Sequence, residues 1–293
     1  MSAQTAGSRA RVTTATFRQM KAAGESIVMI TAYDAPGARL ADAAGVDSIL
    51  VGDSLGMTVL GLDSTLPVTM DDMVRATSAV TRGTGRVLVV ADMPFMSYQV
   101  SDDDAVRNAG RLLAEAGAHA VKLEGGAAVA PLVGRMVDAG IPVMGHVGLT
   151  PQSVNVFGGY KVQARDTESA VTLVEDCLAL EAAGAFAVVL ELVPAEIAAL
   201  VTEELEIPTI GIGAGAGCDG QVQVFHDLLG LGDFLPKHAK RYSDVGAAIT
   251  KAIGAYATDV RAGSFPAEAN LIHADAEVVA ELERMLPLSD DGE

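Results

Sequence analysis

The chain has 293 residues, 50% of them hydrophobic, and a formal net charge of −18 at pH 7. Such an acidic surface repels nucleic acid and anionic lipid, so we expect no nucleic-acid or membrane partner. Its two cysteines lie far apart and outside any C-x-x-C pair, which excludes a disulfide framework and a cysteine zinc site. The N-terminal sequence lacks the apolar segment of a signal peptide, and no run of about 18 apolar residues occurs, so we expect a cytoplasmic protein.

Part of the acidic charge falls where helices are expected to begin, as in "TMDDMV" and "SDDDAV". There it caps the helix and opposes the helix dipole. This explains only some of the excess, and only six of the 20 basic residues are lysines. The remaining acidic excess is equally compatible with adaptation to high salt and with an ordinary acidic surface.

Short runs rich in Val, Ile and Leu alternate along the chain with alanine-rich segments of helical period. A first helix is predicted over 14–23. Strands are then predicted at 26–33, 48–52, 86–93, 119–124, 142–147, 186–192, 208–213 and 233–237, the last with the weakest pattern. Helices are predicted at 35–45, 71–82, 102–116, 127–139, 167–183, 195–205, 221–230 and 244–261, several of them ending in glycine.

The predicted strands are apolar on both faces, which favours a parallel sheet covered by helices. Eight strand–helix units predict a (β/α)8 TIM barrel, with a doubly wound sheet as the alternative. We expect one domain over residues 1–293, with a core of about 12–262. The helix at 14–23 would close the bottom of the barrel, and residues 263–293 would form a polar tail.

Chemistry in this kind of barrel takes place at the C-terminal ends of the strands. Four predicted strands end at or next to an acid: Asp53, Asp92, Glu124 and Glu191. A single acid there often caps the next helix, but four on one rim repel each other unless a cation or a proton lies among them. No His or Cys accompanies the first three, and hard oxygen ligands suit Mg²⁺ better than Zn²⁺.

Lys122 stands two residues before Glu124 in "VKLEGG", so both side chains point to the same face of a buried strand. Burying both charges is costly unless each has a partner. The two could pair with each other inside the barrel. Alternatively, each of the two side chains has a separate partner at the rim of the barrel.

Several of these segments lie in blocks that resemble the ketopantoate hydroxymethyltransferase family. The blocks include "ITAYDAPGARLADAAGVDSILVGDSLGMTVLG", "ADMPFMSY", "VKLEGG", "GHVGLTPQSVNVFGGYKVQAR" and "IPTIGIGAG". The resemblance runs from about residue 12 to about residue 262, and the block beginning "GHVGLTPQ" is the most specific.

The resemblance implies transfer of a hydroxymethyl group from 5,10-methylenetetrahydrofolate, or a related pterin, to 3-methyl-2-oxobutanoate. The product would be 2-dehydropantoate, on the route to pantothenate and coenzyme A, formed through a Mg²⁺-stabilised enolate. The resemblance also implies a homo-oligomer, since the family assembles as ring-like decamers.

By the same resemblance, Asp53, Asp92 and Glu124 match the magnesium site, and Glu191 matches the general base. The oxoacid contacts are matched by Asp53, Ser54, Asp92 and Lys122. His146, in "MGHVG", is a structural residue or, as we hypothesise, a hydrogen-bond partner of the incoming hydroxymethyl oxygen.

The main alternative is another Mg²⁺-dependent 2-oxoacid carbon–carbon lyase or mutase on the same barrel. Such enzymes usually carry a reactive cysteine or a phosphate site, and neither Cys177 nor Cys218 is placed for that role. A barrel that only binds ligands is a second alternative. The G-x-G-x-x-A pattern in "GIGAGAG" follows the seventh predicted strand rather than the first, which argues against a dinucleotide site.

Overall fold

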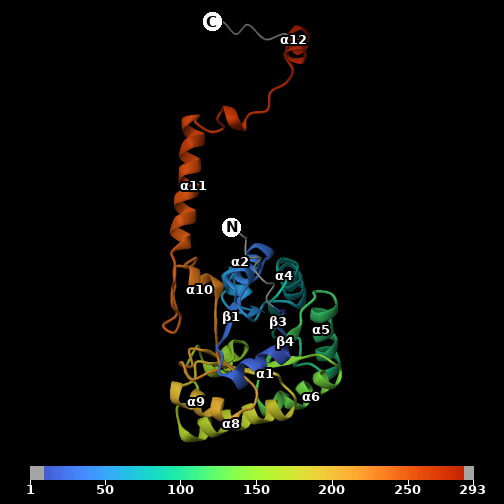
Figure 1. The fold of residues 1–293 in the computed structure, drawn as a ribbon, viewed down its shortest axis with the longest axis vertical. Helices are drawn as coiled ribbons and strands as arrows, with labels where there is room; N and C mark the ends of the chain where they lie inside the picture. Colours follow the sequence, from blue (N-terminus) through green and yellow to red (C-terminus); the bar gives the residue numbers. More distant parts are fainter. Residues whose placement is uncertain (1–9, 287–293) are drawn as a thin grey trace, which may run out of the picture. The chain divides into compact units, whose positions relative to one another are not determined.

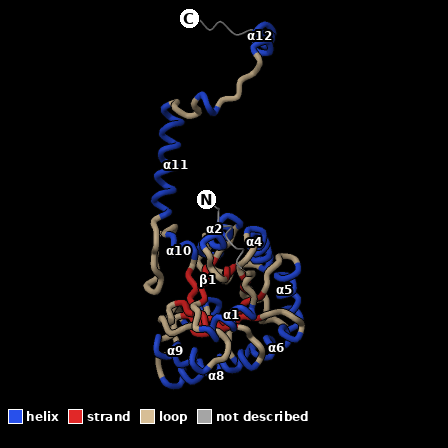
Figure 2. The backbone as a smooth tube through the Cα atoms, in the orientation of Figure 1, coloured by secondary structure: helices blue, strands red, loops and turns tan. Residues whose placement is uncertain are grey.

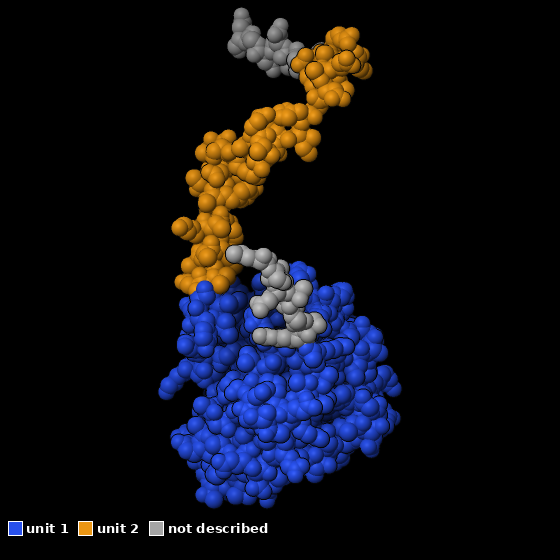
Figure 3. Space-filling view, viewed as in Figure 1, with its two compact units in different colours: residues 1–243 blue, residues 244–293 orange. Residues whose placement is uncertain are grey.

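The structure, a computed structural model, describes residues 10–286. The chain forms two compact units, residues 1–243 and residues 244–293 (Figure 3). The boundary between the units lies at residue 243, directly before the predicted helix 244–261. The sequence instead predicts the end of the core near residue 262. The single domain over 1–293 stays a prediction. Among residues 10–286, no helix is both long and apolar enough to cross a membrane.

The first unit contains eight parallel strands that close into a barrel, with neighbours in sequence order and β8 paired to β1 (Figures 1 and 2). This confirms the (β/α)8 TIM barrel and excludes the doubly wound sheet. The strands are β1 (Ile27–Thr31), β2 (Ser48–Val51), β3 (Leu88–Asp92), β4 (Ala120–Glu124), β5 (Val143–Gly148), β6 (Ala187–Glu191), β7 (Thr209–Ile212) and β8 (Gly220–Gln223).

Helices surround the strands of the first unit (Figure 2). Those of this unit are α1 (Thr14–Ala23), α2 (Ala35–Ala44), α3 (Leu55–Thr58), α4 (Met70–Gly83), α5 (Asp102–Ala114), η1 (Ala127–Val129), α6 (Ala130–Asp138), η2 (Pro151–Ser153), α7 (Val154–Phe157), α8 (Thr167–Ala182), α9 (Ala195–Glu204) and α10 (Phe225–Leu229). The second unit contains α11 (Val245–Ala262), η3 (Glu268–Asn270) and α12 (Ala276–Met285).

The acidic residues at the starts of α4 and α5 lie in the first turn, as the sequence suggested, but the capping residues themselves are a threonine and a serine. Thr69 caps α4 and Ser101 caps α5, each accepting a hydrogen bond from a backbone N–H in the first turn. Asp71 and Asp72 lie in the first turn of α4, where their charge opposes the helix dipole.

The prediction of the last strand was wrong. The eighth strand is Gly220–Gln223, which overlaps the start of the predicted helix 221–230, and no strand occurs at 233–237. The segment reads GQVQ and has no run of Val, Ile or Leu: Gln221 is exposed, and a Cβ atom at Gly220 would lie 2.5 Å from the carbonyl oxygen of Ile27 on β1. Residues 233–237 carry an apolar signal, but Phe234 is 77% exposed and Pro236 cannot donate to a sheet.

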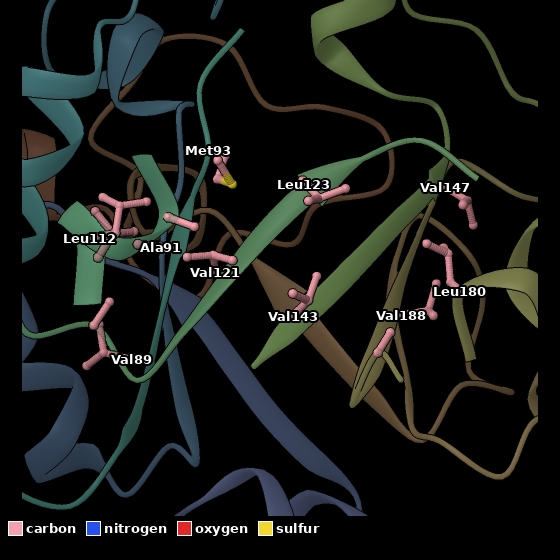
Figure 4. Packing of buried hydrophobic residues seen from close by; sticks show 14 of the residues in the cluster. Val89, Ala91, Met93, Leu112, Val121, Leu123, Val143, Val147, Leu180 and Val188 are labelled. Carbon is pink, nitrogen blue, oxygen red and sulfur yellow. The ribbon is translucent and has the colours of Figure 1, made fainter. Parts of the chain in front are cut away.

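The core has two layers separated by the sheet. Outward-facing residues of the strands form one cluster with residues of the helices, and Figure 4 labels Val121, Leu123 and Val143 of the strands and Leu112 and Leu180 of the helices among its members. The inward-facing residues form a second cluster, which Phe17 of α1 joins. The helix at 14–23 therefore closes the inside of the barrel as predicted.

Inward-facing positions change character along each strand. On β3, β4, β5 and β6 they are apolar or small at the start and ionisable toward the C-terminal end. The inward series are Leu88, Val90 and Asp92; Ala120, Lys122 and Glu124; Met144 and His146; and Ala187, Val189 and Glu191. Because the strands are parallel, their ionisable ends meet at one end of the barrel.

Candidate active site

One cavity of about 1050 Å³ opens at this end of the barrel. Its lining includes every residue that the sequence singled out as a site candidate. These are Asp53, Ser54, Asp92, Lys122, Glu124, His146 and Glu191. Asp53, Asp92, Lys122, Glu124 and His146 are buried, and the side chain of Glu191 is 16% exposed. The structure therefore brings all seven together, whereas their individual roles stay predictions.

Lys122 is the positive centre of the cavity. Its Nζ lies 3.0 Å from Asp92 Oδ1 and 3.0 Å from His146 Nδ1. The first alternative from the sequence, a direct pair with Glu124, does not describe this geometry, because the ion-pair partner is Asp92 on β3. The register explains the choice, since Asp92 is the residue opposite Lys122 in the β3–β4 ladder.

The cavity holds more carboxylates than cations. Burial, followed by repulsion from Asp92 and Glu124, raises the pKa of Asp53 well above its ordinary value. Burial also raises the pKa of Asp92, although the ammonium of Lys122 opposes the rise. Burial acts to lower the pKa of Lys122, but Asp92, Glu124 and Asp53 outweigh it, so its pKa is raised. Lys122 is therefore charged at neutral pH.

His146 connects two of the acids. Its Nδ1 lies 3.5 Å from Glu124 Oε1, and its Nε2 lies 3.2 Å from Glu191 Oε2. Burial and the charge of Lys122 act to lower the pKa of His146, but its hydrogen bonds with Glu124 and Glu191 outweigh them and raise it. The imidazole therefore lies between the carboxylates of Glu124 and Glu191, and both favour its charged form.

Ser54 follows Asp53 at the end of β2, and its Oγ lies 2.9 Å from the hydroxyl oxygen of Tyr33. The backbone N–H of Asp53 donates to Asp92 Oδ2 at 3.0 Å. These contacts bind the ends of neighbouring strands to one another. The sequence reasoning missed Tyr33, although it lies inside the block "ITAYDAPG" that carries the resemblance.

Gln152 is another residue in contact with the site that the sequence reasoning missed. It is buried, and its Nε2 donates to Asp53 Oδ2 at 2.9 Å. Its position in "GHVGLTPQ", the most specific block, was the one signal that could have found it.

The backbone beside Glu191 leaves no room for larger residues. Gly148, at the end of β5, has φ +88°, and a Cβ atom there would lie 2.3 Å from the carbonyl oxygen of Glu191. Leu192, the residue after Glu191, also has a left-handed φ of +47°. Such backbone strain in a non-glycine residue occurs mainly at functional sites.

Three acids could hold a magnesium ion, namely Asp53, Asp92 and Glu124. Their oxygens suit a hard cation, and their mutual repulsion favours one. Asp92 Oδ1 is buried without a well-oriented hydrogen bond, although Lys122 Nζ is close. The donor set therefore fits Mg²⁺. Within residues 10–286, however, no three His, Cys, Asp or Glu side chains are arranged as a ready-made metal centre.

Neither cysteine takes part in the site. Cys177 is buried on α8, where burial raises the pKa of its thiol to about 12, and Cys218 is half-buried beyond β7. Neither lines the cavity. A nucleophilic cysteine of the kind expected for the alternative lyases is therefore absent from this site.

Comparison with known proteins agrees with the family resemblance of the sequence blocks. The sequence model of ketopantoate hydroxymethyltransferase matches residues 11–268. A 3-methyl-2-oxobutanoate hydroxymethyltransferase of Carboxydothermus hydrogenoformans is 59% identical over 259 residues, which cover 88% of this chain and 94% of the relative. The enzyme of the same name from Chloroflexus aurantiacus is 57% identical over 274 residues, covering 93% and 97%.

Several solved structures resemble this chain in fold. A phosphoenolpyruvate phosphomutase from Streptomyces platensis subsp. rosaceus superposes with a TM-score of 0.58 at 19% identity, covering 93% of this chain and 96% of that one. A phosphonopyruvate hydrolase in complex with oxalate and Mg²⁺ gives 0.55 at 15% identity, covering 94% and 96%. At these identities the likeness concerns the barrel alone. The family match and the close relatives establish that the chain belongs to the ketopantoate hydroxymethyltransferase family.

Proposed function

We propose that the protein transfers a hydroxymethyl group from 5,10-methylenetetrahydrofolate to 3-methyl-2-oxobutanoate in the cytoplasm, giving 2-dehydropantoate for coenzyme A biosynthesis. One observation carries the proposal. The six residues that match the family's site line one cavity together with His146, in a chain 57–59% identical to enzymes with this name.

Asp53, Asp92 and Glu124 are the residues that would hold Mg²⁺. When bound, the ion supplies positive charge that polarises the keto group of the oxoacid and stabilises negative charge developing there. The chain's own part is to present three buried carboxylates whose repulsion a divalent cation relieves. Their burial also keeps water away from the reacting atoms.

Lys122 binds the carboxylate of the oxoacid. Its ammonium is buried and charged, so an anionic substrate can share it with Asp92. The hydroxyl of Ser54, oriented by Tyr33, provides a further hydrogen bond to the substrate. Together the two side chains fix the oxoacid with its C3 carbon directed to β6.

Glu191 removes the C3 proton of the oxoacid as a general base. The electron pair of the C3–H bond moves into the adjoining keto group. Water adds to the methylene carbon of the folate and both of its C–N bonds break, so tetrahydrofolate leaves with the two protons of water and the carbon is released as formaldehyde. C3 attacks this carbon, and the alkoxide that forms takes up the proton held by Glu191. His146, 3.2 Å from Glu191 Oε2, orients the base and donates to the incoming hydroxymethyl oxygen.

The cavity has room for the folate as well as the much smaller oxoacid. Its part near β7 and α10 carries apolar side chains, which suit a flat pterin ring, beside the charged Asp227, Asp233 and Lys237. Lys237 adds a positive charge there, in a protein of net charge −18, and suits the carboxylates of the folate glutamate. The apolar residues of this part include Leu192, Ile212, Leu231, Phe234 and Pro236.

We also propose a homo-oligomer. Helix α11 carries four exposed apolar residues on one face, at spacings of four, three and four residues. After β8, the first unit contains only the five-residue helix α10, where a long eighth helix is expected. A second copy of the chain would cover the apolar face, which consists of Ile249, Ile253, Tyr256 and Val260.

The decisive experiment is turnover by the purified full-length chain with 3-methyl-2-oxobutanoate, 5,10-methylenetetrahydrofolate and Mg²⁺. The product 2-dehydropantoate is followed by NMR. Lys122→Met, which keeps the length of the side chain but removes its charge, should raise the KM for the oxoacid strongly. No product from wild-type protein under these conditions would refute the proposed reaction.

A further inference from the structure

Gln152 is the centre of a hydrogen-bond network between three loops of the cavity. It lies in η2, directly after β5. Besides donating to Asp53 Oδ2, its Nε2 donates to the carbonyl oxygen of Met93 at 3.0 Å. Its backbone N–H donates to Glu124 Oε2 at 2.9 Å. One residue therefore contacts the carboxylates of two proposed metal ligands that come from different strands.

The orientation of the Gln152 amide is unambiguous. Its Oε1 accepts from the hydroxyl of Tyr98 at 2.8 Å and from Gln99 Nε2 at 3.3 Å. Rotating the amide by half a turn would set Oε1 against two acceptors, Asp53 Oδ2 and the Met93 carbonyl. The Tyr98 hydroxyl also accepts from the backbone N–H of Glu124 at 3.2 Å, so the network closes on the same acid.

The chemistry of an amide suits this position. Asp53, Asp92 and Glu124 repel each other, so their side chains would otherwise turn apart in the absence of a cation. A neutral amide holds one oxygen of Asp53 without adding a charge, and it leaves the second oxygen for a ligand. A lysine here would compete with the cation, and a glutamate would add to the repulsion.

We propose that Gln152 is a positioning residue of the metal site, which orients the carboxylates of Asp53 and Glu124 toward Mg²⁺. The inference rests on the proposed function, because it assumes that these acids bind the ion. Gln152 touches neither the oxoacid nor the reacting carbon in this account. It acts through the two carboxylates that it holds.

The test measures Mg²⁺ binding by calorimetry, without substrate. Gln152→Leu keeps the volume of the side chain but removes its donors and its acceptor. It should weaken Mg²⁺ binding by about 10- to 100-fold, the usual loss when a side chain that orients a metal ligand is removed. Gln19→Leu is the matched control, because Gln19 is exposed on α1, and its affinity for Mg²⁺ should equal that of wild type.

A second readout separates positioning from a general structural defect. If Gln152→Leu acts through metal affinity, raising the Mg²⁺ concentration should restore much of its activity, with the KM for Mg²⁺ changed more than kcat. A loosened barrel would instead show a lower melting temperature and a rate that added Mg²⁺ does not restore.

The outcomes distinguish the two proposals. No Mg²⁺ binding by wild-type protein would overturn the proposed metal site itself. If wild-type protein binds Mg²⁺ and folded Gln152→Leu binds it with the same affinity, within about twofold, only the role of Gln152 is overturned. If that variant does not fold, Gln152→Asn replaces it, since its amide is one methylene too short to reach both Asp53 and Met93, and the same comparison decides.

Discussion

Replacing Glu191 with glutamine tests the assignment of the general base. The carboxylate ends β6, and its Oε2 is 3.2 Å from His146 Nε2. Glutamine keeps the shape and can accept the same hydrogen bond, but it cannot take a proton from carbon. Loss of a positioned base lowers the rate by about two to four orders of magnitude, or about 3–5 kcal/mol in activation free energy. Exchanging a charged for a neutral acceptor changes stability by only about 1 kcal/mol, so the variant should fold.

Proton removal needs only the oxoacid and Mg²⁺, because the folate reacts afterwards. Wild-type enzyme in D₂O should therefore exchange the C3 hydrogen of 3-methyl-2-oxobutanoate without folate, and NMR follows the exchange directly. Glu191→Gln should lose this exchange and keep its affinity for Mg²⁺. Glu196→Gln, an exposed change on α9, is the matched control and should exchange at the wild-type rate.

Exchange at the wild-type rate in Glu191→Gln would refute the assignment, and His146 would then be the first residue to test as the base. Loss of Mg²⁺ binding in the same variant would also refute the assignment of Glu191 as the base, because Glu191 would then belong to the metal site.

Four further predictions concern metal, charge and the folate. Chelation should abolish activity, and Asp92→Asn should weaken both Mg²⁺ and oxoacid binding; full activity after exhaustive chelation would remove the metal from the mechanism. Burial and neighbouring carboxylates raise the pKa of Asp53, so its ionisation destabilises the metal-free fold. This loss of stability is absent at a pH below the ordinary pKa of an aspartate and complete at a pH above the raised pKa of Asp53. Asp53→Asn should therefore raise the melting temperature of metal-free protein near pH 8, by about 2–4 °C per kcal/mol gained; an unchanged or lower value in a thermal scan would contradict this. Molar KCl should raise the melting temperature if the charge of −18 reflects adaptation to salt, and equal stability in about 10 mM and about 2 M KCl would exclude that adaptation. Lys237→Ala should raise the KM for polyglutamylated folate more than for the monoglutamate in steady-state kinetics, and an equal change for both would exclude contact with the glutamate chain.

The strand predictions succeeded where the signal is local. An apolar run between glycine-ended helices forms a covered parallel strand largely regardless of its neighbours, and seven strands were predicted in this way. The eighth failed because its segment is GQVQ, with an exposed Gln221 and with Gly220 at a position where Ile27 of β1, distant in sequence, leaves no space for a side chain. Its short, glutamine-containing segment has no pattern that periodicity could detect.

The same distinction holds in the site. That Asp53, Asp92, Glu124 and Glu191 meet at one rim follows from the sequence, because parallel strands in a barrel carry their ends to the same side. Which side chains pair there depends on the register between strands and on the loops that follow them. Only the tertiary structure set Lys122 against Asp92 instead of Glu124, His146 against Glu191, and the amide of Gln152 against Asp53. Each of these contacts joins different strands or loops, and no spacing along a single segment encodes such a contact.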